Sequence, residues 1–187
     1  MYLDFLSKLH KSTKRDYLAR VNDKEYPKYK AASLAKKWGY HYWDGNRKIN
    51  YGGYKYIQGR WYPVIKQMIK FYKLKKNCKI LDVGCGKGFL LYEIKNILPK
   101  IKIVGFDSSK YGIENSKEEI RSNLFVHKAE DKYNFSDKEF DLVISIGCLH
   151  NLEVFNLECS IPIKRLVCFR LNCDILYALP ALFTIYL

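Results

Sequence analysis

Residues 79–88 read Lys79-Ile80-Leu81-Asp82-Val83-Gly84-Cys85-Gly86-Lys87-Gly88. The apolar residues at the start of this run are typical of a buried parallel strand. Glycine then recurs at every second position, and a helical pattern begins at once. Glycines at such a junction let the backbone turn tightly and let a ligand approach the main-chain amides. The positive end of the following helix favours a carboxylate or a phosphate. We therefore expect a nucleotide-type cofactor site on an α/β sheet.

The spacing around the glycines narrows the type of site. A dinucleotide-binding loop would read Gly-x-Gly-x-x-Gly, whereas this loop reads Gly-x-Gly-x-Gly. Nineteen residues beyond Gly88, a second apolar run ends on Asp107. A carboxylate at the tip of a second strand can accept hydrogen bonds from both hydroxyls of a ribose. The loop alone is a weak signal, but loop, helix, strand and aspartate at this spacing form a much stronger one.

Strand and helix patterns alternate over the following residues. Further apolar runs follow at 101–106, 124–126 and 140–146. A helical pattern at 89–98 precedes the first of these runs, and a helix expected after Asp107 precedes the second. Such alternation predicts a parallel, doubly wound sheet with right-handed crossovers. Ligands bind these sheets beyond the carboxyl ends of the strands, where the glycine loop and Asp107 both fall.

With these motifs in place, residues 77–155 resemble the class I S-adenosylmethionine-dependent methyltransferases. Residues 80–88 resemble the first motif of that family, and residues 105–107 resemble the second. Residues 129–131 and 140–145 resemble the third and fourth motifs. The resemblance implies S-adenosylmethionine as the cofactor and methyl transfer as the reaction. It also implies a Rossmann-like, doubly wound, mainly parallel sheet with helices on both faces.

The resemblance further implies a set of cofactor-binding residues at the strand ends. These are Asp82, Gly84, Cys85, Gly86, Gly88, Asp107, Ser108, Ala129, Glu130, Asp131 and Ser145. Asp107 would bind the ribose, the backbone of 84–88 would bind the methionine end, and Asp82 would orient the loop. Lys128 stands where many relatives carry an acidic side chain. The adenine contact is therefore assigned to the backbone of residues 129–130 or to the Asp131 side chain.

Tyrosines and glycines alternate between residues 39 and 60. This composition predicts a structured loop or a short hairpin rather than a helix. Either the aromatic rings pack a surface loop, or they form a lid over cofactor and substrate. A sulfonium beside an aromatic face gains about 0.5–2 kcal/mol of cation–π attraction. The candidates here are Tyr51, Tyr54 and Arg60. Arg60 would pair with the cofactor carboxylate or would simply be a solvated charge at a helix start.

One histidine is a candidate catalytic base. Methyl transfer needs a general base only when the acceptor must lose a proton as it attacks. His150 follows the fourth strand pattern and would face the cleft, and its ordinary pKa suits this role. The alternative is that His150 caps the next helix. No metal is expected, because the six cysteines form no Cys-x-x-Cys pair and have no histidine at metal-ligand spacing.

Helical patterns precede the first strand. We expect a basic amphipathic helix over 3–20 and a second helix over 27–38, with Pro27 at its first position and Gly39 as its C-terminal cap. Residues 61–72 carry the clearest apolar helical stripe and should belong to the core. We therefore divide the chain into an N-terminal helical and aromatic extension, residues 1–76, and a cofactor-binding core, residues 77–187.

Size and charge bear on partners and compartment. With 187 residues, the chain is long enough for one well-buried domain. The net charge of +14 can indicate a nucleic acid or a membrane surface as partner. The lysines are scattered, however, as a coding bias would produce. The fourth strand also lacks the Asn/Asp-Pro-Pro-Tyr signature of relatives that methylate amino groups of bases. We expect a small-molecule acceptor, with RNA or protein as the alternative.

The sequence contains no stretch long and apolar enough to span a membrane and no signal-peptide core. The cysteines fit a reducing compartment, and we expect a cytoplasmic protein.

The composition changes from about residue 159. The last 29 residues hold one lysine, Lys164, and residues 175–187 carry no charge. Family members usually continue with a fifth strand and an antiparallel pair, whereas here only 166–171 reads as a strand. One hypothesis is that this tail is not the native C-terminus, which would leave a truncated, non-catalytic cofactor-binding domain. Another is a shortened, incomplete sheet whose apolar tail is covered by a partner, for example in a homodimer.

Overall fold

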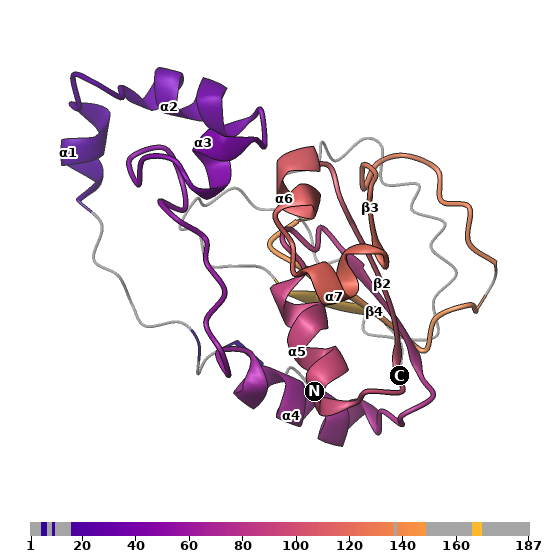
Figure 1. Cartoon of the computed structure of the whole chain (residues 1–187). Helices are drawn as coiled ribbons and strands as arrows, with labels where there is room; N and C mark the ends of the chain where they lie inside the picture. Colours follow the sequence, from indigo (N-terminus) through magenta and orange to yellow (C-terminus); the bar gives the residue numbers. More distant parts are fainter. Residues whose placement is uncertain (1–4, 7–8, 10–15, 137, 149–165, 170–187) are drawn as a thin grey trace, which may run out of the picture.

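The computed structural model describes residues 5–6, 9, 16–136, 138–148 and 166–169, and the fold is given for these. Within them, five parallel strands form one sheet in the order β3-β2-β1-β4-β5 (Figure 1). The strands are β1 (Lys79–Val83), β2 (Lys102–Asp107), β3 (Leu124–Val126), β4 (Leu142–Ile146) and β5 (Leu166–Phe169). The chain runs outward from β1 to β3 and then crosses to the other side of β1. The Rossmann-like, doubly wound fold is therefore confirmed.

Four helices lie against one face of the sheet: α4 (Tyr62–Tyr72), α5 (Phe89–Ile97), α6 (Lys110–Glu114) and α7 (Glu118–Arg121). Apolar residues from these helices meet one face of β1, β2 and β4. The buried members of this cluster include Val64, Ile65, Met68, Ile80, Leu91, Ile94, Ile103, Ile120, Leu142 and Ile144. The helical stripe predicted over 61–72 is thus part of the core.

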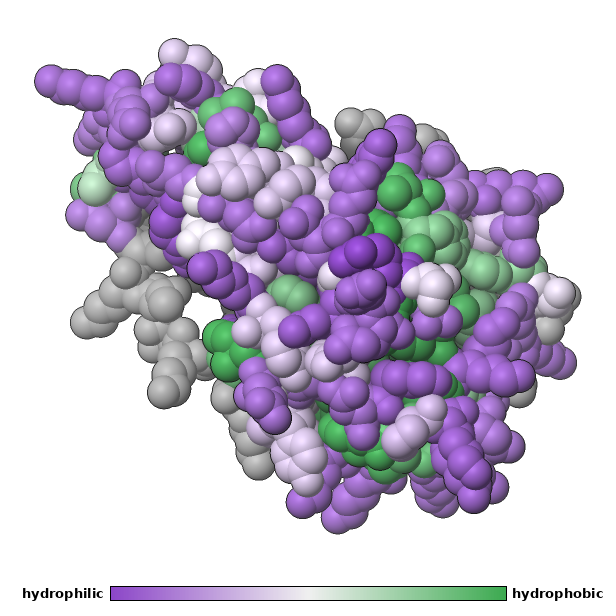
Figure 2. Space-filling view, viewed as in Figure 1, coloured by the Kyte–Doolittle hydropathy of each residue, from purple (hydrophilic) through white to green (hydrophobic). Residues whose placement is uncertain are grey.

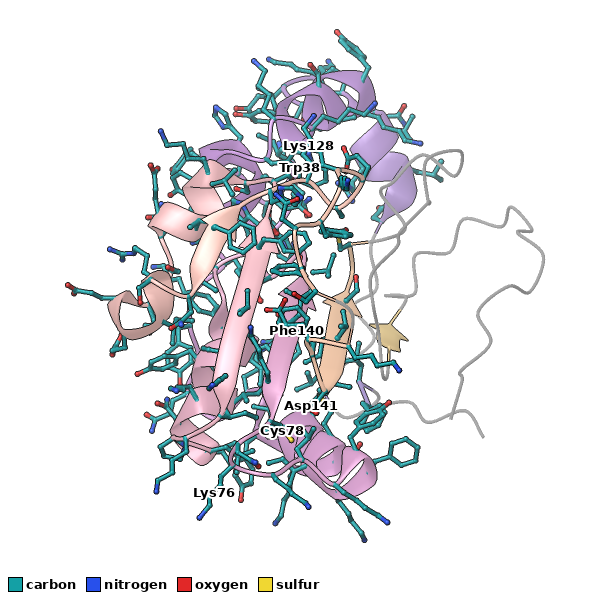
Figure 3. All side chains as sticks on the ribbon, turned by 90° about the vertical axis from the view of Figure 1, so that its right-hand side faces the viewer. Trp38, Lys76, Cys78, Lys128, Phe140 and Asp141 are labelled. Carbon is teal, nitrogen blue, oxygen red and sulfur yellow. The ribbon has the colours of Figure 1, made fainter. Side chains whose placement is uncertain are left out.

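The opposite face is covered by the chain between β3 and β4. Leu81, Val83, Phe106 and Val143 point to this side and pack with Ala129 and Phe140. Figure 3 shows Phe140 beside the strands at mid-height of the sheet. The helix expected near 151–166 falls outside the described residues, as does most of the tail from residue 159.

The predicted helix over 3–20 is wrong as a continuous element. Phe5 and Leu6 form a turn, and the helix α1 (Tyr17–Val21) begins only after Asp16. Asp16 is the N-cap of this helix, because its backbone is extended and its carboxylate accepts a hydrogen bond from the Ala19 amide at 2.9 Å. Phe5 is instead buried and contacts aromatic rings of α4.

Two further expectations about the N-terminal part need correction. The second helix, α2 (Lys28–Ala35), ends before residue 38, and the left-handed conformation falls on Trp38, with φ 50°, rather than on Gly39. Gly39 is extended and begins a one-turn helix, α3 (Tyr40–Trp43), inside the segment predicted to lack helix. The Gly39 carbonyl accepts hydrogen bonds from the amides of Tyr42 and Trp43.

The face of the molecule shown in Figure 2 is largely hydrophilic, also over α1 to α3. Apolar side chains reach the surface on β3, where Phe125 is 39% and Val126 51% exposed. No helix among the described residues is long and apolar enough to cross a membrane. The division into residues 1–76 and 77–187 stays a prediction.

Candidate functional site

The loop between β1 and α5 takes a conformation that requires glycine. Gly84, Gly86 and Gly88 have φ values of 75°, 58° and 68°, in the left-handed region that favours glycine. A Cβ atom on Gly86 would lie 2.7 Å from Cη2 of Trp43, and one on Gly84 would lie 2.6 Å from Sγ of Cys148. Other parts of the chain therefore approach the bare backbone of this loop closely.

Most of the loop amides have acceptors inside the protein. Those of Gly84 and Cys85 donate to the Phe106 carbonyl at 2.9 and 3.0 Å, and that of Gly88 donates to the Cys85 carbonyl at 2.9 Å. The Gly86 amide donates to Oδ2 of Asp107 at 2.8 Å. The carboxylate of a ligand would have to share these amides with the acceptors that they already have. The expectation that a ligand approaches the main-chain amides of this loop is refined accordingly.

Asp107 joins the glycine loop to the start of α6. Its Oδ1 accepts a hydrogen bond from the Ser109 amide at 2.8 Å, and Oδ2 accepts the one from Gly86. The side chain is buried, and burial raises its pKa although these two bonds oppose the shift. Each oxygen retains a lone pair that can accept a ribose hydroxyl. Ser108, the neighbouring candidate, is exposed.

A second carboxylate lies at the end of the adjacent strand. Asp82 is 4% exposed, and burial together with the charge of Asp107 raises its pKa to about 7. The hydroxyl of Ser145 at the end of β4 is also buried, and it has no hydrogen-bond partner among the described residues. Two buried carboxylates at neighbouring strand ends favour a cationic ligand.

The remaining predicted cofactor residues differ in their surroundings. Ala129 is buried, and its carbonyl accepts a hydrogen bond from the Tyr133 hydroxyl. Glu130 and Asp131 are exposed. Figure 3 shows the neighbouring Lys128 at the same end of the sheet as Trp38, opposite to Lys76 and Cys78. The thiol of Cys85 has its pKa raised by burial.

Arg60 and His150 are the remaining candidates from the sequence. Arg60 is exposed in the turn before α4. Burial raises the pKa of Tyr54, and the positive charge of Arg60 counteracts part of this rise. His150 lies outside the described residues.

Residues 38–56, here called the aromatic segment, pack directly on the glycine loop. The buried indole of Trp43 covers Gly86, and its Nε1 donates to Oγ of Ser109 at 2.8 Å. Tyr51 stacks on Trp43 with ring centroids 5.3 Å apart and an interplanar angle of 2°. Tyr54 contacts Tyr51 and stacks on Phe89 of α5. The predicted tyrosines therefore lie near the glycine loop, where they pack on other aromatic rings.

A half-buried ion pair fixes this arrangement. Lys87, 4% exposed, places Nζ 2.8 and 2.7 Å from the two carboxylate oxygens of Asp44 and 2.9 Å from the Tyr54 carbonyl. The Tyr111 hydroxyl donates to Oδ2 of Asp44 at 2.8 Å. Burial raises the pKa of Asp44, but the bonds from Lys87 and Tyr111 outweigh it and lower the pKa overall. Sequence reasoning missed Asp44 and Lys87, because no local pattern links residues this far apart.

Comparisons with known proteins agree on the type of domain. The family model described as a methyltransferase domain matches residues 74–168. A ubiquinone biosynthesis O-methyltransferase of Pelagibacter ubique is 27% identical over 158 residues, 78% of this chain and 62% of that protein. A ribosomal RNA small subunit methyltransferase C of Buchnera aphidicola is 32% identical over 98 residues, 51% of this chain and 28% of that protein. The chain therefore spans less than two thirds of either relative.

Among solved structures, a SAM-dependent methyltransferase from Aquifex aeolicus is similar, with 25% identity and a TM-score of 0.36. The match covers 44% of this chain and 47% of that one.

Proposed function

This chain belongs to the class I S-adenosylmethionine-dependent methyltransferases, whose cofactor is S-adenosylmethionine, and we propose that it transfers a methyl group to a small-molecule acceptor. The observation that carries the proposal is the carboxylate of Asp107. It stands at the end of β2, buried, bonded to the Gly86 amide at 2.8 Å and still able to accept hydroxyl groups.

The residues at the strand ends fit this cofactor. When bound, S-adenosylmethionine supplies a methyl group activated by a positively charged sulfonium. Asp107 would hold the ribose, and the close approach at Gly84 and Gly86 leaves no room there for a side chain. When ionised, Asp82 and Asp107 would offer negative charge at the ends of β1 and β2 to the positively charged cofactor. The protein's own contribution to the reaction is mainly to align the acceptor and to exclude water.

A small acceptor is supported by the cover over the loop. Trp43, Tyr51 and Tyr54 pack on the glycine loop and α5, which favours an enclosed site over an open groove. The relative named for ubiquinone biosynthesis aligns with 78% of this chain, which points in the same direction. If the acceptor is a hydroxyl, His150 remains the proposed general base.

The test begins with the cofactor. Calorimetric titration of the full chain with S-adenosylmethionine and with S-adenosylhomocysteine should show binding. Asp107→Ala should abolish it, and Glu114→Ala, which removes an exposed carboxylate of α6, should leave it unchanged. Equal binding by Asp107→Ala and the unchanged chain would refute the assignment of Asp107. Binding without turnover on any acceptor would favour the alternative of a non-catalytic cofactor-binding domain.

RNA is the second candidate acceptor. It is favoured by the net charge of +14 and by the similarity to a ribosomal RNA methyltransferase. Protein–phosphate contacts release counterions, so RNA binding should weaken steeply as salt rises. Binding to a structured RNA that is salt-dependent and accompanied by methyl incorporation would support this candidate over a small molecule.

A further inference from the structure

Three residues of the aromatic segment bind the glycine loop and the start of α6 through hydrogen bonds: Trp38, Trp43 and Asp44. The Ser109 hydroxyl donates to the Trp38 carbonyl, and the Trp43 indole donates to the same hydroxyl oxygen. Asp44 forms the third attachment through Lys87 and Tyr111. Only the third attachment is an ion pair.

These attachments place the indole of Trp43 against the two residues that hold the carboxylate of Asp107. The indole contacts Gly86 and Ser109, and the amides of these same two residues bind the two oxygens of Asp107. Asp107 is 9% exposed in this arrangement. Movement of the segment that carries Trp43 would therefore uncover the two residues that hold Asp107.

The ion pair makes the largest number of hydrogen bonds among the three attachments. Lys87 offers three donor hydrogens, and both oxygens of Asp44 and the Tyr54 carbonyl lie within 2.9 Å of Nζ. All three acceptors belong to the aromatic segment, whereas Lys87 belongs to the glycine loop. Lys87 is the buried partner, whereas the Asp44 side chain is 22% exposed. Separation would leave the buried Lys87 ammonium without a counter-charge, which is costly, so the pair resists partial opening.

We propose that Asp44 and Lys87 are positioning residues whose ion pair holds the aromatic segment closed over Gly86 and Asp107 and must separate for the cofactor to enter and leave. This inference rests on the proposed use of S-adenosylmethionine at the same loop. It assigns to Trp43 the role of the covering side chain and to Tyr111 that of a second support for Asp44.

The test measures cofactor exchange by stopped-flow tryptophan fluorescence on the full chain. Asp44→Asn should raise both the association and the dissociation rate of S-adenosylhomocysteine at least tenfold, with a smaller change in Kd. Asp44→Glu, which keeps the charge, should restore rates near those of the unchanged chain. Glu114→Gln, which breaks an exposed ion pair with Lys110 at 3.7 Å, is the matched control and should change neither rate. Unchanged rates in folded Asp44→Asn would overturn the proposal.

A second measurement needs no cofactor. The Gly53 amide donates to the Trp43 carbonyl at 3.0 Å. Its hydrogen exchange should be at least tenfold faster in Asp44→Asn, and protection equal to that of the unchanged chain would overturn the proposal. The Tyr54 amide also donates to Oδ1 of Asp44 at 3.1 Å, so the substitution would change its exchange directly. If the unchanged chain binds no S-adenosylhomocysteine, the proposed function fails while this readout still tests the ion pair. If Asp44→Asn does not fold, Tyr111→Phe, which removes one bond to Asp44, should raise exchange two- to threefold, and no increase would count against the proposal.

Discussion

Replacing Gly86 by alanine tests the packing of the N-terminal part on the cofactor loop. The residue has φ 58°, and a left-handed conformation costs a residue with a Cβ about 1–2 kcal/mol. The new Cβ would also lie 2.7 Å from the buried indole of Trp43. Forcing extra volume into a packed core costs about 1–3 kcal/mol. We therefore expect Gly86→Ala to lower the free energy of unfolding by about 2–5 kcal/mol.

A double-mutant cycle separates the two contributions. Equilibrium urea unfolding would be followed by circular dichroism for Gly86→Ala, Trp43→Ala and the double variant. With the indole removed, Gly86→Ala should cost only the backbone strain, about 1–2 kcal/mol. Gly59→Ala is the matched control, because Gly59 has φ 75° and no atom within 4 Å of an added Cβ. If Gly86→Ala costs the same with and without Trp43, the indole does not lie on the loop and the reasoning fails.

Three further predictions concern buried groups of the core. The raised pKa of Asp82, about 7, means that the folded chain keeps a proton that the unfolded chain releases, so stability should fall as pH rises from about 4 to 7. Asp82→Asn removes this titration. Its free energy of unfolding, relative to that of the unchanged chain, should therefore rise by about 3 kcal/mol between pH 5 and pH 8, as measured by urea unfolding at both pH values. Glu93→Ala should lower the free energy of unfolding by about 1–3 kcal/mol in the same assay, because the Trp61 amide donates to the Glu93 carboxylate at 3.1 Å. Glu93→Gln keeps an acceptor and should lower it less, and equal losses for the two variants would contradict this explanation. Phe140→Ala should lower the thermal midpoint by an amount equivalent to about 3–5 kcal/mol, because the ring is fully buried, and a loss below 1 kcal/mol would contradict this packing.

The sheet could be predicted from the sequence because its signals are local. Apolar runs at 80–83 and 124–126 coincide with strands, and the residues that end β1 and β2 stand at the predicted edge. The stripe in α4 was also readable, since Val64, Ile65 and Met68 follow helical spacing. Each of these elements is determined by residues a few positions apart.

The N-terminal part could not be predicted in the same way. The turn after α2 falls on Trp38 rather than Gly39, because the Trp38 carbonyl is held by the distant Ser109 hydroxyl. The partners Asp44 and Lys87 are 43 residues apart and follow no local pattern. The sequence leaves open whether Tyr51 and Tyr54 pack a surface loop or form a lid, because their packing partners, such as Phe89 of α5, depend on the folded sheet.

The distance along the chain between Trp43 and its partners also has a consequence for synthesis. Trp43 precedes Ser109 by 66 residues, so at about 5–20 residues per second it leaves the ribosome roughly 3–13 s earlier. During this interval the surface on which Trp43 packs does not yet exist. The tyrosines and tryptophans of this part therefore remain in an aromatic-rich nascent chain, and we expect them to dock only after β2 and the start of α6 have been made.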